Sequence, residues 1–217
     1  MTDHHLVVID IETAPLVDVD DYLEAVNPPA NYRDQAKIDV YCQEARHKQV
    51  ETAALDPDLC RLVALAYEVP GENRCHSCLM TNNAQEVVAL DAFWASFPAQ
   101  VFVGFGILDF DLPVLLRRSL YLGINAPKLE LGKYRHPRVI DMKSVLSHDG
   151  LLKWRSKDFY CKRFGINVDD PMTGADVGAA IERGDYEAVR QHCVADVKKE
   201  LLLARRIGIV PPDAEVF

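Results

Sequence analysis

Two carboxylates lie two residues apart at the end of an apolar stretch near the start of the chain. Asp10 and Glu12 follow residues 6–9, a β-branched and apolar run typical of a buried strand. Alternate residues of a strand point to one face, so both carboxylates face the same side. A carboxylate at the end of a buried strand is costly unless it is paired or binds a metal. Such a pair suits phosphodiester hydrolysis, in which carboxylates hold two cations roughly 3.5–4 Å apart.

An acidic pair at a strand end is also common on ordinary surfaces, so the elements around it matter. Period-two apolar runs are typical of strands, and apolar residues three and four apart are typical of helices. On these patterns we expect strands at about 6–12, 61–69, 74–80, 101–105 and 138–142, and helices at about 83–97, 109–122, 143–148, 156–164, 176–183 and 185–207. This order predicts a mixed α/β sheet flanked by helices.

We expect one domain over residues 1–217, with an acidic insertion at about 16–58. A chain of 217 residues is long enough for one domain with a full core. A connection of the length of 16–58 without secondary structure would be unusual, so helical stretches are expected within it. The last helix should begin at Asp185, whose side chain can cap it, and end before Gly208.

The charge is unevenly distributed along the chain. Residues 1–60 contain 13 acidic and 4 basic residues, which accounts for the whole formal net charge of −9. Residues 128–163 instead contain ten Lys and Arg against four acidic residues. The net acidity therefore does not exclude a polyanionic substrate, because it is local and because bound cations offset clustered carboxylates.

Membrane and secreted classes are disfavoured. No apolar run reaches 18 residues, and the first five residues lack the basic and apolar regions of a signal peptide, so we expect a cytoplasmic protein. Six cysteines are too sparse for a disulfide scaffold. Cys75 and Cys78 have the spacing of a zinc or redox pair, but no second ligand pair is evident. A strand or turn that carries two thiols is the preferred interpretation.

Three motifs contain the acidic residues of interest, namely VVIDIETAP (7–15), VGFGILDFDLP (103–113) and QHCVADV (191–197). In order and separation they resemble the three motifs of the DEDD exonuclease superfamily, which includes the proofreading domains of DNA polymerases. Residues 151–196 also resemble the branch related to the exonuclease domain of family-B DNA polymerases. In that branch a short helix ending in a Phe-Gly-Ile-like string precedes a Gly-Asp-Tyr segment and the third motif.

This resemblance implies an RNase H-like fold and a metal-dependent 3′-5′ exonuclease. It assigns Asp10, Glu12, Asp111 and Asp196 as ligands of two Mg²⁺ or Mn²⁺ ions, gathered from a strand, a helix start and the last helix. The implied substrate is nucleic acid with a free 3′ end, and the implied products are nucleoside 5′-monophosphates. DNA is favoured over RNA only by the similarity to family-B polymerases.

Two other functions stay open at this point. One is a 3′-5′ exoribonuclease. The other is a degenerate RNase H-like module that binds nucleic acid or a protein, which the four intact carboxylates argue against. DNA repair, RNA turnover, phage-related processes and anti-phage defence are all compatible roles.

One departure from the family pattern concerns the third motif. The branch that the chain resembles most has a Tyr four residues before the last Asp, where this chain has His192. Another major branch has a His five residues before, where this chain has Gln191. Residues four apart share a helix face, so His192 can lie beside the metals. Histidine titrates near neutral pH, which suits a general base. There are two alternatives. The orienting role of Tyr is lost and activity is reduced, or His192 is an ordinary core or surface residue.

The second motif also departs from the family pattern. Gly106 stands where many relatives carry Asn. If that Asn contacts the substrate, this chain either does without the contact or uses Asp109 instead. Asp141 follows an apolar pair at a strand end and has two possible roles. It can support the metal ligands, or it can be the N-cap of the helix that follows.

Residues 128–163 contain both basic and aromatic residues. This mixture suits single-stranded nucleic acid, since basic groups bind phosphates and aromatic rings stack on unpaired bases. A solvated basic face with ordinary core aromatics is the alternative. In related folds an apolar residue just after the first motif separates the terminal nucleotides, and Leu16 is the candidate for this role here. The full set of candidate substrate contacts is Thr13, Leu16, Phe110, Lys153, Trp154 and Arg155.

Overall fold

The chain folds around a five-stranded sheet that is part antiparallel and part parallel. The structure is a computed structural model that describes residues 6–132 and 135–211. Its strands are β1 (Leu6–Pro15), β2 (Cys60–Glu68), β3 (Cys75–Leu79), β4 (Val101–Gly104) and β5 (Val139–Asp141). Their order is β3-β2-β1-β4-β5; β1, β2 and β3 are antiparallel neighbours, whereas β1, β4 and β5 are parallel. The predicted mixed sheet is confirmed.

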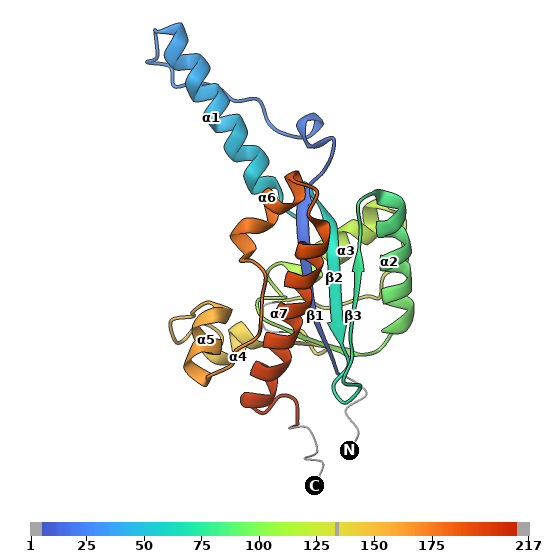
Figure 1. The fold of residues 1–217 in the computed structure, drawn as a ribbon. Coiled ribbons are helices and arrows are strands. Elements are labelled where there is room, and N and C mark those ends of the chain that lie inside the picture. Colours follow the sequence, from blue (N-terminus) through green and yellow to red (C-terminus); the bar gives the residue numbers. More distant parts are fainter. Residues whose placement is uncertain (1–5, 133–134, 212–217) are drawn as a thin grey trace.

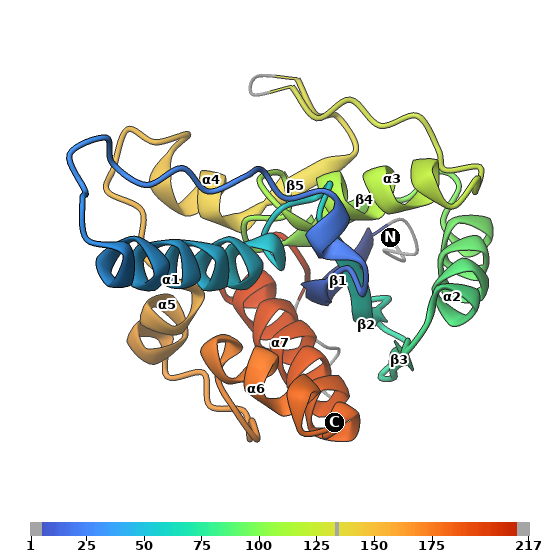
Figure 2. The ribbon, with the colours of Figure 1, turned by 90° about the horizontal axis from the view of Figure 1, so that it is seen from above.

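Helices cover both faces of this sheet (Figure 2). On one face, α2 (Asn83–Ser96) and α3 (Asp111–Tyr121) pack around Phe93, Phe102 and Leu112. On the other face lie α4 (Met142–Ser147), α5 (Lys157–Phe164), α6 (Val177–Glu182) and α7 (Tyr186–Arg206). All six predicted helices are confirmed. Among the described residues, no helix has the length and apolar character needed to cross a membrane.

The alternation of side chains along β1 places the first two carboxylates. Val7, Ile9 and Ile11 belong to the core under α2 and α3, whereas Val8 belongs to the core under α7. Asp10 and Glu12 follow the same alternation as Val8 and therefore face α7. A bulge in the β1–β2 pairing between Glu12 and Thr13 ends the regular register just after them.

α7 is the longest helix of the described chain and crosses the sheet (Figure 1). It begins as predicted, because the side chain of Asp185 accepts a hydrogen bond from the amide of Ala188. It ends at Arg206, two residues before Gly208, which has a φ of 78°. Its buried face is apolar except for three polar residues at a spacing of four, His192, Asp196 and Glu200. This spacing turns all three toward β1.

α1 (Gln35–Ala53) is a 19-residue helix within the predicted acidic insertion, and it projects away from the sheet (Figure 1). A 3-10 turn, η1 (Val19–Asp21), precedes it. Only Ala53 of α1 is buried. Arg46 binds the exposed Asp20 at 2.7 Å, and the hydroxyl of Thr13 donates to the carbonyl of Ala54 at 2.6 Å. The Arg46 contact joins α1 to η1, and the Thr13 contact holds the C-terminal end of α1 against β1.

Candidate active site

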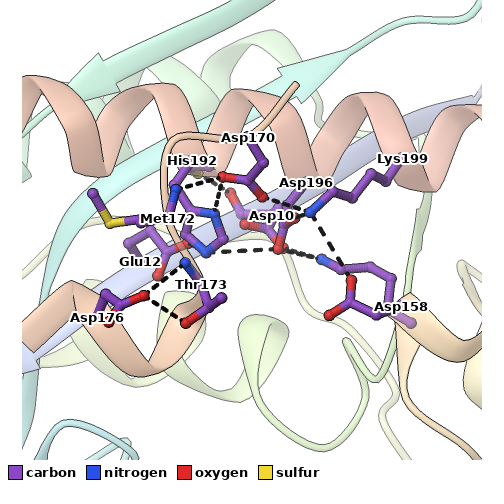
Figure 3. A network of polar contacts seen from close by, with 12 residues as sticks. Asp10, Glu12, Asp158, Asp170, Met172, Thr173, Asp176, His192, Asp196 and Lys199 are labelled. Atoms are coloured by element: carbon purple, nitrogen blue, oxygen red, sulfur yellow. Dashed lines mark hydrogen bonds and ion pairs between the residues drawn. The ribbon is translucent and has the colours of Figure 1, made fainter. Parts of the chain in front are cut away.

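Four carboxylates from three elements converge beside β1. Asp10 and Glu12 come from β1, Asp111 is the first residue of α3, and Asp196 lies in the middle of α7. Figure 3 shows Asp10, Glu12 and Asp196 directed toward one another. Ligand atoms of Glu12, His192 and Asp196 lie within 4.8 Å of one another, as do those of Asp10, Glu12 and Cys193. Three of the four predicted carboxylates are therefore brought together, and the fourth, Asp111, is near enough for the charge of Asp10 to raise its pKa.

The position of Asp111 depends on Asp141, which fixes the loop between β4 and α3. The carboxylate of Asp141 accepts hydrogen bonds from the amides of Gly106 at 2.9 Å and Leu108 at 3.1 Å. The same carboxylate accepts from the amide of Lys143 at 2.8 Å and caps α4. The N-cap role considered from the sequence is confirmed, and Asp141 also supports the loop that leads into Asp111.

Gly106 lies in that loop with a φ of 81°, a conformation that glycine and asparagine adopt more easily than other residues. A Cβ atom there would meet only the Lys143 side chain, at 3.7 Å. The loop therefore has space for a side chain at this position, but the positive φ would strain a residue other than glycine. Asp109, the suggested substitute, instead pairs with the Lys143 ammonium group at 2.7 Å.

Sequence reasoning missed Lys157, the first residue of α5, whose ammonium group lies among the carboxylates. Its Nζ atom is 2.6 Å from Asp196 Oδ2, 3.2 Å from Glu200 Oε1 and 3.4 Å from Asp10 Oδ1. An internal cation at this point offsets charges that would otherwise repel one another. Glu200 was also missed, and the polar residues at a spacing of four on α7 are the sequence signal that could have revealed it.

His192 is almost fully buried and is held by two acidic partners. Its Nδ1 atom is 2.7 Å from Asp170 Oδ1, and its Nε2 atom is 3.5 Å from Glu12 Oε1. Asp170 also binds the Lys199 ammonium group at 2.5 Å, and Lys199 reaches Asp196 Oδ1 at 2.9 Å. Figure 3 shows this chain of contacts. An ionised carboxylate can only accept, so we assign the Nδ1 proton to the bond with Asp170. This leaves Nε2 toward the carboxylate cluster.

Burial disfavours the charged form of three of the four carboxylates. Burial raises the pKa of Asp10, and burial with the nearby Asp10 raises the pKa of Glu12. Burial, again with Asp10, raises the pKa of Asp111 to about 8. Burial also acts on Asp196, but Lys157 and Lys199 outweigh it and lower its pKa.

The donor set suits a hard divalent cation. All four predicted ligands offer carboxylate oxygens, the ligands that Mg²⁺ and Mn²⁺ prefer. Asp10 Oδ2 is buried and has no hydrogen-bond partner among the described residues. Buried oxygens of this kind are rare in proteins unless an ion or water binds them. Asp10, Glu12, Asp111 and Asp196 could therefore hold divalent cations, with the Lys157 ammonium group close to the same oxygens.

The candidate substrate contacts fall into two groups. Thr13 and Phe110 line a cavity next to Glu12, whereas Leu16 is not part of its lining. Lys153, Trp154 and Arg155 lie exposed before α5. The Lys143 ammonium group lies 4.6 Å from the centre of the Trp154 ring. The roles of all these residues stay predictions.

Cys75 and Cys78 both lie in β3, and neither is in a disulfide. Burial raises the pKa of the Cys75 thiol to about 11 and also raises that of Cys78. Such thiols are protonated near neutral pH and are weak metal ligands and nucleophiles. The interpretation as a strand that carries two thiols therefore fits the structure.

Residues 54–210 match the model of a protein family described as a predicted 3′-5′ exonuclease related to the exonuclease domain of PolB. The chain belongs to this family. The match includes Asp111, His192 and Asp196 but begins after Asp10, Glu12 and α1. No match was found among the curated proteins.

A solved structure supports the fold of this family member. The family B DNA polymerase from the hyperthermophilic archaeon Pyrobaculum calidifontis is similar, with a TM-score of 0.61 and 16% sequence identity. The similarity covers 93% of this chain and 24% of the polymerase chain. The mixed sheet, its helices and this similarity confirm the RNase H-like fold expected from the motifs.

Proposed function

We propose that this exonuclease-family chain is a metal-dependent enzyme that hydrolyses phosphodiester bonds from the 3′ end of nucleic acid and releases nucleoside 5′-monophosphates. The observation that carries the proposal is the cluster of Asp10, Glu12 and Asp196, in which a buried oxygen of Asp10 lacks a partner among the described residues. Asp111 lies close enough for the charge of Asp10 to raise its pKa. DNA is the proposed substrate because the family is related to the exonuclease domain of PolB and the fold is similar to that of a DNA polymerase.

The four carboxylates, His192 and the residues that hold them have different roles in this proposal. The four carboxylates would hold two Mg²⁺ or Mn²⁺ ions. When bound, these ions would activate a water molecule and stabilise negative charge on the phosphate. His192 would take the proton of the attacking water at Nε2, because Asp170 occupies Nδ1. Asp170 and Lys199 would hold His192 and Asp196 in place.

The polarity of attack is the direct test of this function. With Mn²⁺ present, a 5′-labelled single-stranded DNA should give a ladder that shortens one nucleotide at a time from its far end. A closed circle should stay intact, because it has no 3′ end. Early release of a labelled mononucleotide from the 5′ end, or cutting of the circle, would contradict the proposal. A matched RNA strand tests the exoribonuclease alternative, and tight binding without cleavage of either strand would favour the degenerate module.

Metal removal should destabilise the protein, because Lys157 and Lys199 are then the cations that pair with the carboxylates among the described residues. Addition of Mn²⁺ at about a hundred times its Kd should raise Tm by roughly 5–10 °C. Differential scanning calorimetry with EDTA and with Mn²⁺ measures this shift. An unchanged Tm at millimolar Mg²⁺ and Mn²⁺ would argue against a cation site.

Replacement of Lys157 by Met extends this prediction. The metal-free variant should lose roughly 3–5 kcal/mol of unfolding free energy, because buried carboxylates lose their internal cation. Mn²⁺ should then raise Tm more than in the wild type, since no ammonium group competes for the same oxygens. Lys198→Met is the matched control, because Lys198 is an exposed lysine on α7, next to Lys199 in the sequence. Equal Mn²⁺ shifts in all three proteins would show that Lys157 does not occupy the cation site.

A further inference from the structure

Glu200 is a buried carboxylate beside the predicted metal ligands, and it has no role in the mechanism proposed above. It lies on α7 one turn after Asp196, and 1% of its surface is exposed. Its Oε1 atom accepts a hydrogen bond from Lys157 Nζ at 3.2 Å, whereas its Oε2 atom is buried and has no hydrogen-bond partner among the described residues. A Cβ atom at Gly104, the last residue of β4, would lie 3.2 Å from this Oε2 atom. A buried carboxylate oxygen without a partner is costly, so it needs a physical explanation.

Lys157 connects Glu200 to the predicted ligands. Its ammonium group is closer to Asp196 Oδ2, at 2.6 Å, than to Glu200 Oε1, at 3.2 Å, or to Asp10 Oδ1, at 3.4 Å. Only 17% of the Lys157 side chain is exposed, so its charge depends mainly on protein partners. Cations bound to Asp10 and Asp196 would take two of these partners and repel the ammonium group. Of its three acidic partners among the described residues, Glu200 would remain.

Lys199 has a similar arrangement at the other oxygen of Asp196 (Figure 3). Its ammonium group is 2.9 Å from Asp196 Oδ1 and 2.5 Å from Asp170 Oδ2. Each of the two lysines therefore contacts Asp196 and also one largely buried acid outside the predicted ligand set. Four ligand carboxylates can neutralise two divalent cations, and the two further acids can neutralise the two lysines. Without Glu200, the metal-bound site would hold an uncompensated buried positive charge, which is strongly unfavourable.

From these contacts we infer that Glu200 is a positioning residue for Lys157, and that it holds the ammonium group when divalent cations occupy the predicted ligands. Only a small shift of the ammonium group is needed, because it already lies 3.2 Å from Glu200 Oε1. The Oε2 atom can then accept a second hydrogen bond from the same group. Lys157 thus stabilises the carboxylates in the metal-free site and pairs with Glu200 in the metal-bound site. The inference rests on the proposed function and adds to it how the site exchanges an internal cation for metal ions.

A double-mutant cycle on Glu200 and Lys157 tests this inference through metal binding alone. Glu200→Gln keeps the size of the side chain and removes its charge. In calorimetric titrations of the metal-free proteins it should weaken Mn²⁺ binding by about tenfold or more, because Lys157 then stays with Asp196. In a Lys157→Met background the same change should alter Mn²⁺ affinity by about twofold or less, because no ammonium group competes for the ligands. Glu44→Gln, an exposed change on α1, is the control.

Glu200→Asp is a second variant that retains the charge, and its Mn²⁺ affinity should lie closer to that of the wild type than the affinity of Glu200→Gln does. Three results would overturn the inference. They are a Glu200→Gln affinity equal to that of the control, equal weakening with and without Lys157, and equal losses in Glu200→Asp and Glu200→Gln. In each case the wild type still binds Mn²⁺. Absence of Mn²⁺ binding by the wild type is instead a failure of the proposed function, so the two failures are distinguishable.

Discussion

Asp10→Asn is expected to reduce cleavage of a labelled oligonucleotide by at least about 10³-fold, since loss of a ligand removes several kcal/mol of transition-state stabilisation. The substitution keeps the size of the side chain and removes only its charge. Burial already disfavours the charged form of Asp10 and raises its pKa, so the metal-free variant should unfold at or above the wild-type Tm. Loss of activity with Tm retained separates a role in the site from a role in folding.

Asp196→Asn should be equally inactive but less stable. Lys157 and Lys199 both bind the Asp196 carboxylate and lower its pKa, so the charged form stabilises the metal-free fold. The Asn variant loses both ion pairs, and its metal-free Tm should fall. Asp91→Asn, an exposed change on α2, is the control for both variants. Activity near the wild-type rate in purified Asp10→Asn would refute the assignment of the site.

His192→Ala should slow cleavage by roughly 10²–10⁴-fold, the usual effect of removing a general base. His192→Gln has a similar size but cannot accept a proton near neutral pH, so it should be similarly slow. His192→Tyr should retain more activity than His192→Ala, because it restores the Tyr that stands at this position in the branch that the chain resembles most. Single-turnover rates with saturating Mn²⁺ measure the chemical step in all three variants.

Asp170→Asn tests the orientation of His192. It should lower the single-turnover rate less than His192→Ala and leave the Mn²⁺ affinity close to that of the wild type, because Asp170 contacts His192 at Nδ1 and reaches Asp196 through Lys199. Gln191→Ala is the control, since Gln191 is the exposed neighbour of His192 on α7. If His192→Ala and His192→Gln both cleave at the wild-type rate, His192 only packs within the site.

Local patterns in the sequence were sufficient for most of the fold. The apolar run before Asp10, the strands β2 and β3 and the cap at Asp185 each depend on neighbouring residues, and each was predicted near its observed place. The orientation of α1 could not be predicted in this way. Only Ala53 of this helix is buried, so no apolar face in the sequence indicates where it packs.

In the candidate site too, residues in local motifs could be predicted, whereas residues brought in by the tertiary fold could not. The four carboxylates and His192 lie in short motifs, so the sequence could identify them. Lys157 contacts Asp10 across 147 positions of sequence, and Asp170 contacts His192 across 22. Neither pair follows a local spacing rule, because the tertiary fold alone brings the partners together.

Calorimetric titration of Mn²⁺ into the metal-free wild type and into Asp10→Asn tests the central claim most directly. The claim is that Asp10, Glu12, Asp111 and Asp196 together hold the cations needed for hydrolysis. We expect the wild type to bind about two ions per chain, as a two-metal site requires. Asp10→Asn should bind fewer ions or bind them far more weakly. Absence of binding to the wild type at millimolar Mn²⁺, or equal binding by both proteins, would contradict the claim.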